Sequence, residues 1–216
     1  SAVQSVSAFS QEVNGSLTLG TGATACIHLL PPLLQHLRQQ HPLLTVGVTT
    51  GNTLDIVRAV EENRLDLGLV TLPVQGRSLA VTAVVDEEFV VIHPSHEAGI
   101  PAVCTPEELQ ALPLIAFEAG SGTRDLIDRW FRSAGLAVTP VMQLGSIEAI
   151  KRMVRAGLGY SIVPRMAVEQ AEDRYGLTVH SLAPSLYRQL AVVMRQDKVI
   201  TKGMAEMLRL LQAVRL

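Results

Sequence analysis

The sequence predicts an α/β fold made of two lobes, with a hinge and a cleft between them. Short apolar strands alternate with amphipathic helices along the chain, which is the pattern of βαβ units that build a parallel sheet. The alternation comes in two blocks, and the strand that joins them has a charged centre, Asp86-Glu87-Glu88. A late strand and a final helix follow the second block. We therefore expect the chain to cross back to the first lobe at its end.

The length and composition suit two such lobes and exclude several classes of protein. At 216 residues, 48% of them hydrophobic and 18% charged, the chain can bury a core without disulfides or metals. The formal net charge is −2 and no basic stripe is present, whereas surfaces that grip nucleic acid carry clustered Lys and Arg. No apolar run reaches the ~20 residues that a membrane span needs. We therefore expect this chain to contact neither DNA nor a membrane.

The cysteine content and the chain start favour a cytoplasmic location. The two cysteines, Cys26 and Cys104, lie far apart in the sequence and do not form the framework of a secreted protein. The first residues show no charged-then-apolar pattern of a signal peptide.

An amphipathic helix is expected at the start of the chain, because Val3, Val6, Phe9 and Val13 have helical spacing. Asn14-Gly15 ends this helix, since both residues tolerate the left-handed conformation of a helix end. The helix precedes the first strand and belongs to no later unit. It is interpreted as the end of an element that begins upstream.

The first block supplies the first lobe. Its expected elements are a strand at 17–20, a helix running to about residue 40, a strand at 44–50, a helix at 54–65 and a strand at 66–71. His41-Pro42 ends the first of these helices, because proline cannot continue a helix.

The second block begins after the joining strand, which is expected over residues 81–93. A helix starts at Thr105-Pro106, where Glu108 completes a capping box. The elements that follow are a strand at 112–117, a helix containing Trp130 and Phe131, a strand at 141–144, a helix at 147–156, a strand at 160–164, a helix at 166–174, a strand at 189–194 and a helix at 204–214. These bounds place lobe 1 at residues 15–86 and 195–216 and lobe 2 at 87–194, with hinge strands near 84–91 and 188–195.

Candidate binding residues lie in the turns that follow the strands. In open α/β sheets, ligands bind beyond the carboxyl ends of the strands, where helix N-termini present unpaired N–H groups and a positive dipole end. Glycine lets the backbone approach a ligand and Ser or Thr adds a hydroxyl, a combination that suits a carboxylate, sulfate or phosphate group. The candidates are Thr21, Gly22, Thr24, Asn52, Thr53, Thr71, Gly120, Ser121, Gly122, Thr123, Gly145 and Ser146.

Each of these residues has an alternative interpretation as a cap of its own helix, which is the commoner role for any single turn. The segment Gly120-Ser121-Gly122-Thr123-Arg124 favours binding, because one cap needs neither two glycines nor a following arginine. Arg124 is expected to pair either with a bound anion or with Glu118 or Asp128 on the surface.

No catalytic, metal or cofactor site is predicted. His93 and His96 lack the further ligands that a metal site needs. Cys26 is interpreted as a small buried apolar residue rather than a reactive thiol. The acids Asp86-Glu87-Glu88 are expected to be solvated hinge residues. The chain has no nucleophile elbow, P-loop or dinucleotide fingerprint, so an enzyme is disfavoured.

Seven segments occur in a characteristic order between about Gly15 and Val214. They read GSLTLG, QQHP, LTVGVTTGNT, VEENRLDLGLVT, EEFVVIHPSH, AFEAGSGTR and MVRAGLGYSIVP. Their order and spacing are similar to the regulatory domain of LysR-type transcriptional regulators. The resemblance implies two Rossmann-like lobes, as in type 2 periplasmic binding proteins, with an effector in the cleft. Residues 1–14 then resemble the end of the family's linker helix, and the winged helix-turn-helix that binds DNA is missing from this chain.

The resemblance also implies roles for the turns and a mode of assembly. The residues that match effector-contacting positions are Thr21, Thr24, Gly51, Asn52, Thr53 and Thr71 in the first lobe and Ser121, Gly122, Thr123, Ser146 and Pro164 in the second. The family assembles as a homodimer or homotetramer, and here the first long helix and the helix at 147–156 are the expected contacts. Peroxide-sensing members carry two nearby cysteines in the second lobe, where this chain has Cys104 alone, which argues against thiol sensing.

The expected function is therefore to sense a small effector, an organic acid or an inorganic anion. Binding would shift the population of lobe or dimer geometries and so the spacing of the DNA-binding heads. The alternative is a solute-binding protein of a transport system, which would lack the helix before Gly15. An enzyme on the same fold would need a catalytic carboxylate or lysine in the cleft, and none of Lys151, Lys198 and Lys202 follows a strand into a turn.

Overall fold

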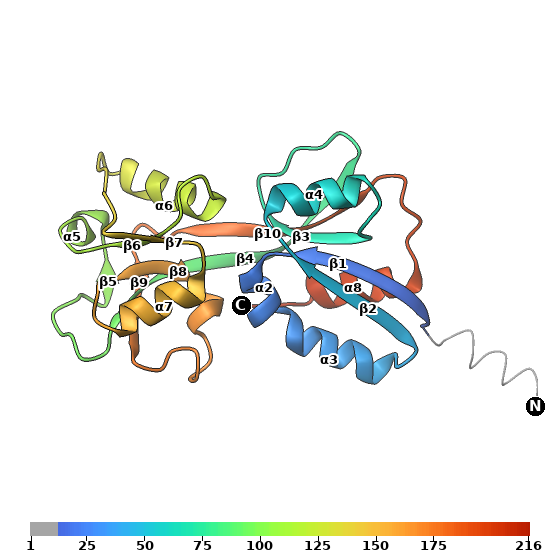
Figure 1. Ribbon diagram of the computed structural model, residues 1–216, viewed down its shortest axis with the longest axis horizontal. Coiled ribbons are helices and arrows are strands. Elements are labelled where there is room, and N and C mark those ends of the chain that lie inside the picture. Colours follow the sequence, from blue (N-terminus) through green and yellow to red (C-terminus); the bar gives the residue numbers. More distant parts are fainter. Residues whose placement is uncertain (1–12) are drawn as a thin grey trace, which may run out of the picture. The chain divides into compact units, whose positions relative to one another are not determined.

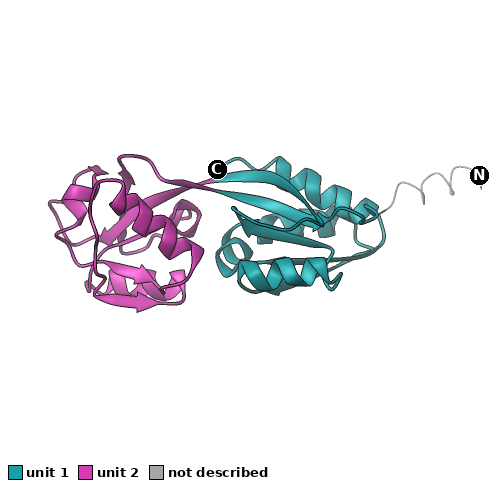
Figure 2. Ribbon diagram, turned by 90° about the horizontal axis from the view of Figure 1, so that it is seen from above, with its two compact units in different colours: residues 1–86, 189–216 teal, residues 87–188 magenta. Residues whose placement is uncertain are grey.

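The computed structural model describes residues 13–216 (Figure 1). Contacts between residues divide the chain into two compact units (Figure 2). Unit 1 extends to Asp86 and resumes at Gln189, and unit 2 is Glu87–Arg188. The helix expected at the start of the chain falls on residues 1–12, outside the described range. The sequence predicted that the chain returns to the first lobe at residue 195, whereas unit 1 resumes at Gln189. The strand β10 (Tyr187–Arg195) contains both positions and its apolar pattern is continuous, so the sequence does not mark the boundary.

The sheet of unit 1 contains the three strands of the first block. β1 (Gly15–Thr21) lies between β2 (Leu44–Thr50) and β3 (Leu67–Thr71), and all three run parallel. β10 (Tyr187–Arg195) pairs with β3 in the antiparallel direction, so the late strand joins this sheet. Because β1, β2 and β3 are parallel, their carboxyl ends and the turns that follow lie at one edge.

Helices cover both faces of the unit 1 sheet (Figure 1). α4 (Thr53–Glu61) buries Ile56 and Val60 on one face. α3 (Leu30–Gln40) and α8 (Lys202–Gln212) lie on the other face. The apolar spacing of each helix accounts for the face that it buries.

The helix that was expected to run unbroken to about residue 40 is divided in two. α2 (Ala23–His28) ends before Leu29, and α3 begins at Leu30. Pro31 and Pro32 explain the division, because they lack backbone N–H donors and are tolerated only in a first helical turn.

Unit 2 is built around the second half of the long joining strand. Its strands are β4 (Leu79–Pro94), which enters from unit 1, β5 (Val103–Cys104), β6 (Ile115–Phe117), β7 (Met142–Leu144), β8 (Ser161–Pro164) and β9 (Leu177–Leu182). β4 pairs antiparallel with β8 and with β9, and β9 pairs parallel with β5. β6 and β7 form a parallel pair of their own.

The alternation of side chains along β4 divides the core of unit 2 into two clusters. Phe89 and Val91 pack with Trp130 of α6 (Gly122–Arg132). Val90 and Ile92 pack in the other cluster, with α7 (Ile147–Arg155). Successive residues of a strand face opposite sides, so the apolar run of β4 serves two helices at once.

Local capping placed one helix of unit 2 where the sequence predicted it. Thr105 accepts a hydrogen bond from the Glu108 N–H, and Pro106 opens α5 (Pro106–Leu109).

The helix expected at 166–174 is wrong, because only the 3-10 turn η1 (Arg165–Val168) forms there. Lys151 Nζ donates to the Ala167 carbonyl over 2.6 Å, so a contact with α7, which local periodicity does not reveal, holds this turn in place.

Candidate functional site

Thr21 ends β1 and is fully buried. Its hydroxyl donates to the Leu69 carbonyl of β3 over 2.8 Å, and its carbonyl accepts the Gly51 N–H at 3.0 Å. Thr21 therefore joins the end of β1 to the end of β3 and to the turn after β2. These contacts give it a role in holding the candidate turns together.

The turns after β2 and β3 mix capping residues with open hydroxyls. Asn52 is the N-cap of α4 and accepts the Asp55 N–H at 2.8 Å, so the capping interpretation is confirmed for this residue. Thr53 and Thr71 are half-buried, and neither hydroxyl has a hydrogen-bond partner among residues 13–216.

The turn after β1 leads into α2. Gly22 is the N-cap of α2 and offers no side chain to cap it. Thr24 is half-buried, and within the described part of the chain its hydroxyl makes no hydrogen bond. Among the candidate residues of unit 1, the hydroxyls that remain available to a ligand are therefore those of Thr24, Thr53 and Thr71.

The glycine-rich turn of unit 2 lies between β6 and α6. Ser121 is the N-cap of α6: its hydroxyl accepts the Arg124 N–H at 3.1 Å and donates to the Glu118 carbonyl over 2.9 Å. Gly120 has a φ of +85°, a conformation that favours glycine. Ser121 and Gly120 thus shape the turn, and the exposed Gly122 begins the helix.

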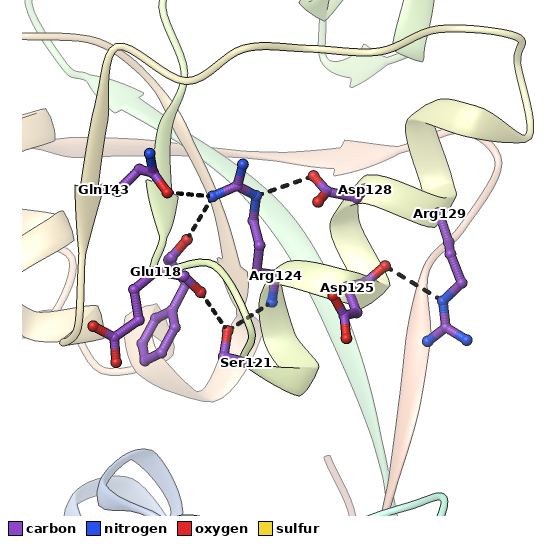
Figure 3. A network of polar contacts seen from close by, with 8 residues as sticks. Glu118, Ser121, Arg124, Asp125, Asp128, Arg129 and Gln143 are labelled. Atoms are coloured by element: carbon purple, nitrogen blue, oxygen red, sulfur yellow. Dashed lines mark hydrogen bonds and ion pairs between the residues drawn. The ribbon is translucent and has the colours of Figure 1, made fainter.

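Arg124 is held by its own surroundings (Figure 3). Its Nε donates to Asp128 at 3.1 Å, and its Nη1 donates to the Phe117 carbonyl at 3.1 Å and to Gln143 at 3.0 Å. Of the two partners considered for Arg124, an anion or a neighbouring carboxylate, this structure contains the carboxylate of Asp128. The guanidinium thereby connects α6 to β6 and to β7, which positions the turn.

The remaining candidates of unit 2 follow β7 and β8. Ser146 is the N-cap of α7 and accepts the Ala149 N–H at 3.2 Å. Gly145 lies against the carboxylate of Glu118, which would be 3.0 Å from an added Cβ. Pro164 is buried at the end of β8, opposite Phe89 of β4. Ser146 thus has a capping role, and Pro164 is part of the sheet.

Two glycines leave open space at helix starts. A Cβ added at Gly22 or at Gly122 would meet no atom within 4 Å, and neither residue has a positive φ. Packing and backbone conformation therefore do not require glycine at either position. Free space at the N-terminus of a helix is what a bound anion needs.

The sequence reasoning missed the two residues with the most unusual environment in unit 2. Glu87 was expected to be solvated but is 1% exposed, so that prediction is wrong. Its carboxylate pairs with Arg188 of β10 at 2.6 Å, and Arg188 also donates to the Thr123 hydroxyl at 2.9 Å. An acidic residue inside an apolar strand was the available signal, but its partner lies about a hundred residues away.

The histidines and cysteines lie apart from any metal-ligand cluster: within residues 13–216 no group of three or more His, Cys, Asp or Glu side chains could hold a metal ion. His93 is buried in β4, with its Nε2 2.6 Å from His180 Nε2. Burial, and then the charge of Glu108, raise the pKa of the Cys104 thiol, which disfavours the reactive thiolate. No helix in this range is long and apolar enough to cross a membrane.

Comparison with protein families matches nearly the whole chain. A family described as "LysR substrate binding domain" matches residues 10–215. The HTH-type transcriptional regulator YeiE of Escherichia coli K12 is 29% identical over 199 residues, which are 92% of this chain and 68% of that protein. YofA of Bacillus subtilis, also an HTH-type transcriptional regulator, is 29% identical over 90% of this chain and 66% of its own length. The chain therefore spans about two thirds of the length of these relatives.

Solved structures share the fold. The regulatory domain of CcmR from Synechocystis, in complex with 2-PG, has a TM-score of 0.81 at 26% identity, covering 93% of this chain and 97% of that one. The cofactor-binding domain of the Cbl transcriptional regulator has a TM-score of 0.84 at 20% identity, over 93% of this chain and 89% of that one. An H2O2-bound mutant of OxyR from Corynebacterium glutamicum has a TM-score of 0.80 at 22% identity, covering 98% of this chain and 70% of that one.

Proposed function

The chain belongs to the family of LysR substrate binding domains, and from this premise we propose that it senses a small anionic effector, which contacts the strand-end turns of its units. The contacts assigned to unit 1 are Gly22, Thr24, Asn52, Thr53 and Thr71, with Thr21 holding the turns. Those assigned to unit 2 are Gly120, Ser121, Gly122, Thr123, Gly145 and Ser146, with Arg124 and Pro164 as supporting residues.

The turn into α6 supports this proposal most strongly. Gly122 begins an eleven-residue helix at the carboxyl end of the parallel strand β6 and leaves open space where a side chain would stand. Ser121 and Arg124 use their hydrogen bonds to hold this turn in place. The first N–H groups of the helix are then directed to a rigid, unobstructed position, which suits a carboxylate or phosphate group.

The CcmR regulatory domain supplies independent support for a small-molecule effector. That domain was solved with 2-PG, shares 26% identity with this chain and has the same fold. We infer that the effector here is also a small molecule, and the open N-terminus of α6 favours an acid.

The mechanism that we propose is a population shift. An effector that binds one domain geometry better than another favours that geometry in proportion to its differential affinity. The chain spans about two thirds of its HTH-type relatives. The DNA-binding part of the whole regulator would receive the signal, in the cytoplasm.

Assembly as a homodimer or homotetramer is also proposed. The candidate contacts are the α2–α3 segment and α7. Ile27 of α2 is 49% exposed, although it is a large hydrophobic residue. A single exposed apolar side chain is ordinary on a protein surface, so the family relationship carries this proposal and Ile27 is only compatible with it.

A solute-binding protein of a transport system and an enzyme are the rival functions. The relatives that match most of the chain are transcriptional regulators, which favours the regulator. The described residues bring together no nucleophile, base and acid, so we propose a non-enzymatic role.

Thermal unfolding of the chain against organic acids, amino acids, sulfate and phosphate tests this function. A ligand at 100 times its Kd adds about 2.7 kcal/mol to the free energy of unfolding, which raises Tm by several degrees. We expect at least one acid to raise Tm, and Gly122→Ala to reduce the rise by about half or more, since a tenfold loss of affinity leaves the ligand at only 10 times its Kd. If no acid raises Tm, or if Gly122→Ala leaves the rise intact, the anion site at α6 is wrong.

A further inference from the structure

In unit 2, the side chains of Glu87, Arg188 and Thr123 form a polar cluster at the start of α6. Arg188 Nε donates to Glu87 Oε2 over 2.6 Å, and Arg188 Nη1 donates to Thr123 Oγ1 over 2.9 Å. The guanidinium carbon lies 4.9 Å from the centroid of the Phe89 ring. Three contacts on three sides thus fix the orientation of the Arg188 side chain, which is 11% exposed.

The cluster is incomplete in its hydrogen bonds. Glu87 is 1% exposed, and its Oε1 has no hydrogen-bond partner among the described residues. Within the same range Arg188 Nη2 also makes no hydrogen bond. The N–H groups of Gly122 and Thr123 have no intrahelical acceptor, because they belong to the first turn of α6. A buried carboxylate oxygen without a donor is costly, so the cluster lacks one donor and at least one acceptor.

A single small molecule can supply both missing groups. Anionic oxygens would accept hydrogen bonds from Arg188 and from the start of α6, where the helix dipole also favours negative charge. A hydroxyl, amino or protonated acid group on the same molecule would donate to Glu87 Oε1. We propose that this cluster binds the effector, and that the effector is an acid with a hydrogen-bond donor next to its anionic group, such as a hydrogen phosphate or an α-hydroxy acid.

This proposal rests on the proposed function and makes it more specific. Glu87 is the specificity residue, because its negative charge repels an anion that has no proton to offer and accepts a hydrogen bond from one that has. Building in such a repulsive element is a general way to reject a close analogue. Arg188 is the residue that contacts the anion, and Glu87 and Phe89 position it.

Inorganic phosphate and sulfate test whether Glu87 selects an anion that carries a proton. The two anions have similar size and shape, but only phosphate keeps a proton at neutral pH. We expect calorimetric titration of the chain to give phosphate about tenfold higher affinity than sulfate, the difference that one charge-assisted hydrogen bond makes. In Glu87→Gln the sulfate affinity should rise and the preference for phosphate should disappear. In Arg188→Lys both affinities should fall, because an ammonium lacks the planar fork that contacts Glu87, Thr123 and the anion in fixed directions.

Glu88→Gln is the matched control. Glu88 is the next residue of β4 and forms an ion pair of its own with Arg165 at 2.8 Å. The preference for phosphate should be unchanged in this variant. Urea unfolding of each variant shows whether it is folded at the temperature of the titration, and a merely structural Glu87–Arg188 pair would change stability without changing anion selectivity.

Equal affinity for the two anions in the unaltered chain, or a preference that survives Glu87→Gln, would overturn the proposal. If anions bind and Gly122→Ala lowers their affinity, while the Glu87 and Arg188 variants leave it unchanged, the proposed function stands and this inference fails. If neither inorganic anion binds, this inference also fails, and the organic acids of the thermal screen then decide the proposed function separately.

Discussion

Lys151 Nζ donates a hydrogen bond to the Ala167 carbonyl over 2.6 Å, and the Lys151 side chain is only 3% exposed. The carboxylate of Glu148, one turn earlier on α7, lies 3.2 Å from the same nitrogen and supplies a counter-charge. A buried ammonium is tolerated when it is paired and hydrogen-bonded in this way. The contact holds η1 against α7, and η1 leads out of β8, a strand of the unit 2 core.

Loss of the Lys151 ammonium should destabilise unit 2. In Lys151→Met the Ala167 carbonyl loses its donor inside the protein, so we expect the free energy of unfolding to fall by about 1–3 kcal/mol. Urea denaturation followed by circular dichroism measures the change. Arg152→Met, at the next and exposed position of α7, is the control. Equal effects of the two variants would contradict the role of the Ala167 contact.

Alanine at Gly122 should separate ligand binding from stability. The added methyl group meets no atom within 4 Å and alanine favours a helix, so the unliganded chain should be as stable as before or more stable by up to about 1 kcal/mol. The same methyl would collide with an anion bound at the start of α6. We therefore expect the acid that raises Tm in the thermal screen to lose at least tenfold in affinity. Thermal unfolding and calorimetric titration of one preparation give both values.

Gly68→Ala, in contrast to Gly122→Ala, should destabilise the chain. Its added Cβ would lie 2.8 Å from Ile56 and 2.9 Å from Val193, which is closer than real side chains approach. Overpacking of this kind costs about 1–3 kcal/mol. A stable Gly68→Ala variant would show that the close packing of α4 on β3 and β10 is not as described.

Asp66 should make the stability of unit 1 fall at acid pH. Burial raises the pKa of Asp66, but hydrogen bonds from Lys198 and Thr18 outweigh burial and hold the pKa below its ordinary value. A carboxyl group with a lowered pKa in the folded chain contributes stability at neutral pH, and this contribution is lost as the pH falls through the folded pKa. The stability difference between the unaltered chain and Asp66→Asn should therefore be large at neutral pH and disappear in acid. Urea unfolding across that pH range measures it, and a difference independent of pH would contradict the assignment.

His180 should give unit 2 a separate pH dependence at a higher pH. Burial and then the charge of His93 lower the pKa of His180 in the folded chain, against a hydrogen bond to Ala102 that raises it. The unfolded chain then binds more protons, so stability should fall as the pH drops from the ordinary value of about 6.5 through the folded pKa. His180→Gln should flatten this dependence, while His36→Gln on the exposed surface of α3 should not. Unfolding midpoints between about pH 7 and pH 5 distinguish the two.

Much of the fold could be predicted from the sequence because its signals are local. The bounds of β2 at 44–50 and the start of α5 at Pro106 depend on a few neighbouring residues, namely a short apolar run with turn residues after it and a Thr-Pro cap. The order of segments carried the family resemblance for the same reason. The break between α2 and α3 was also local, in Pro31 and Pro32, but a strong apolar periodicity concealed it.

The features that were missed depend on contacts between distant residues. The turn at η1 contacts Lys151, sixteen positions earlier, and local periodicity gives no sign of this contact. The burial of Glu87 depends on Arg188, at the far end of unit 2. For Arg124, the sequence left an anion, Glu118 and Asp128 as alternatives, and only the structure places the guanidinium against Asp128. The candidate turns themselves could be identified, because glycine and hydroxyl residues after a strand form a local pattern.

The most direct test of the account is an NMR titration of the isotopically labelled chain with the acid that raises Tm most in the thermal screen. We expect the amide resonances of Gly122 and Thr123, at the start of α6, to shift with one common Kd. That result would place the effector at this turn. Shifts confined to other residues would contradict it.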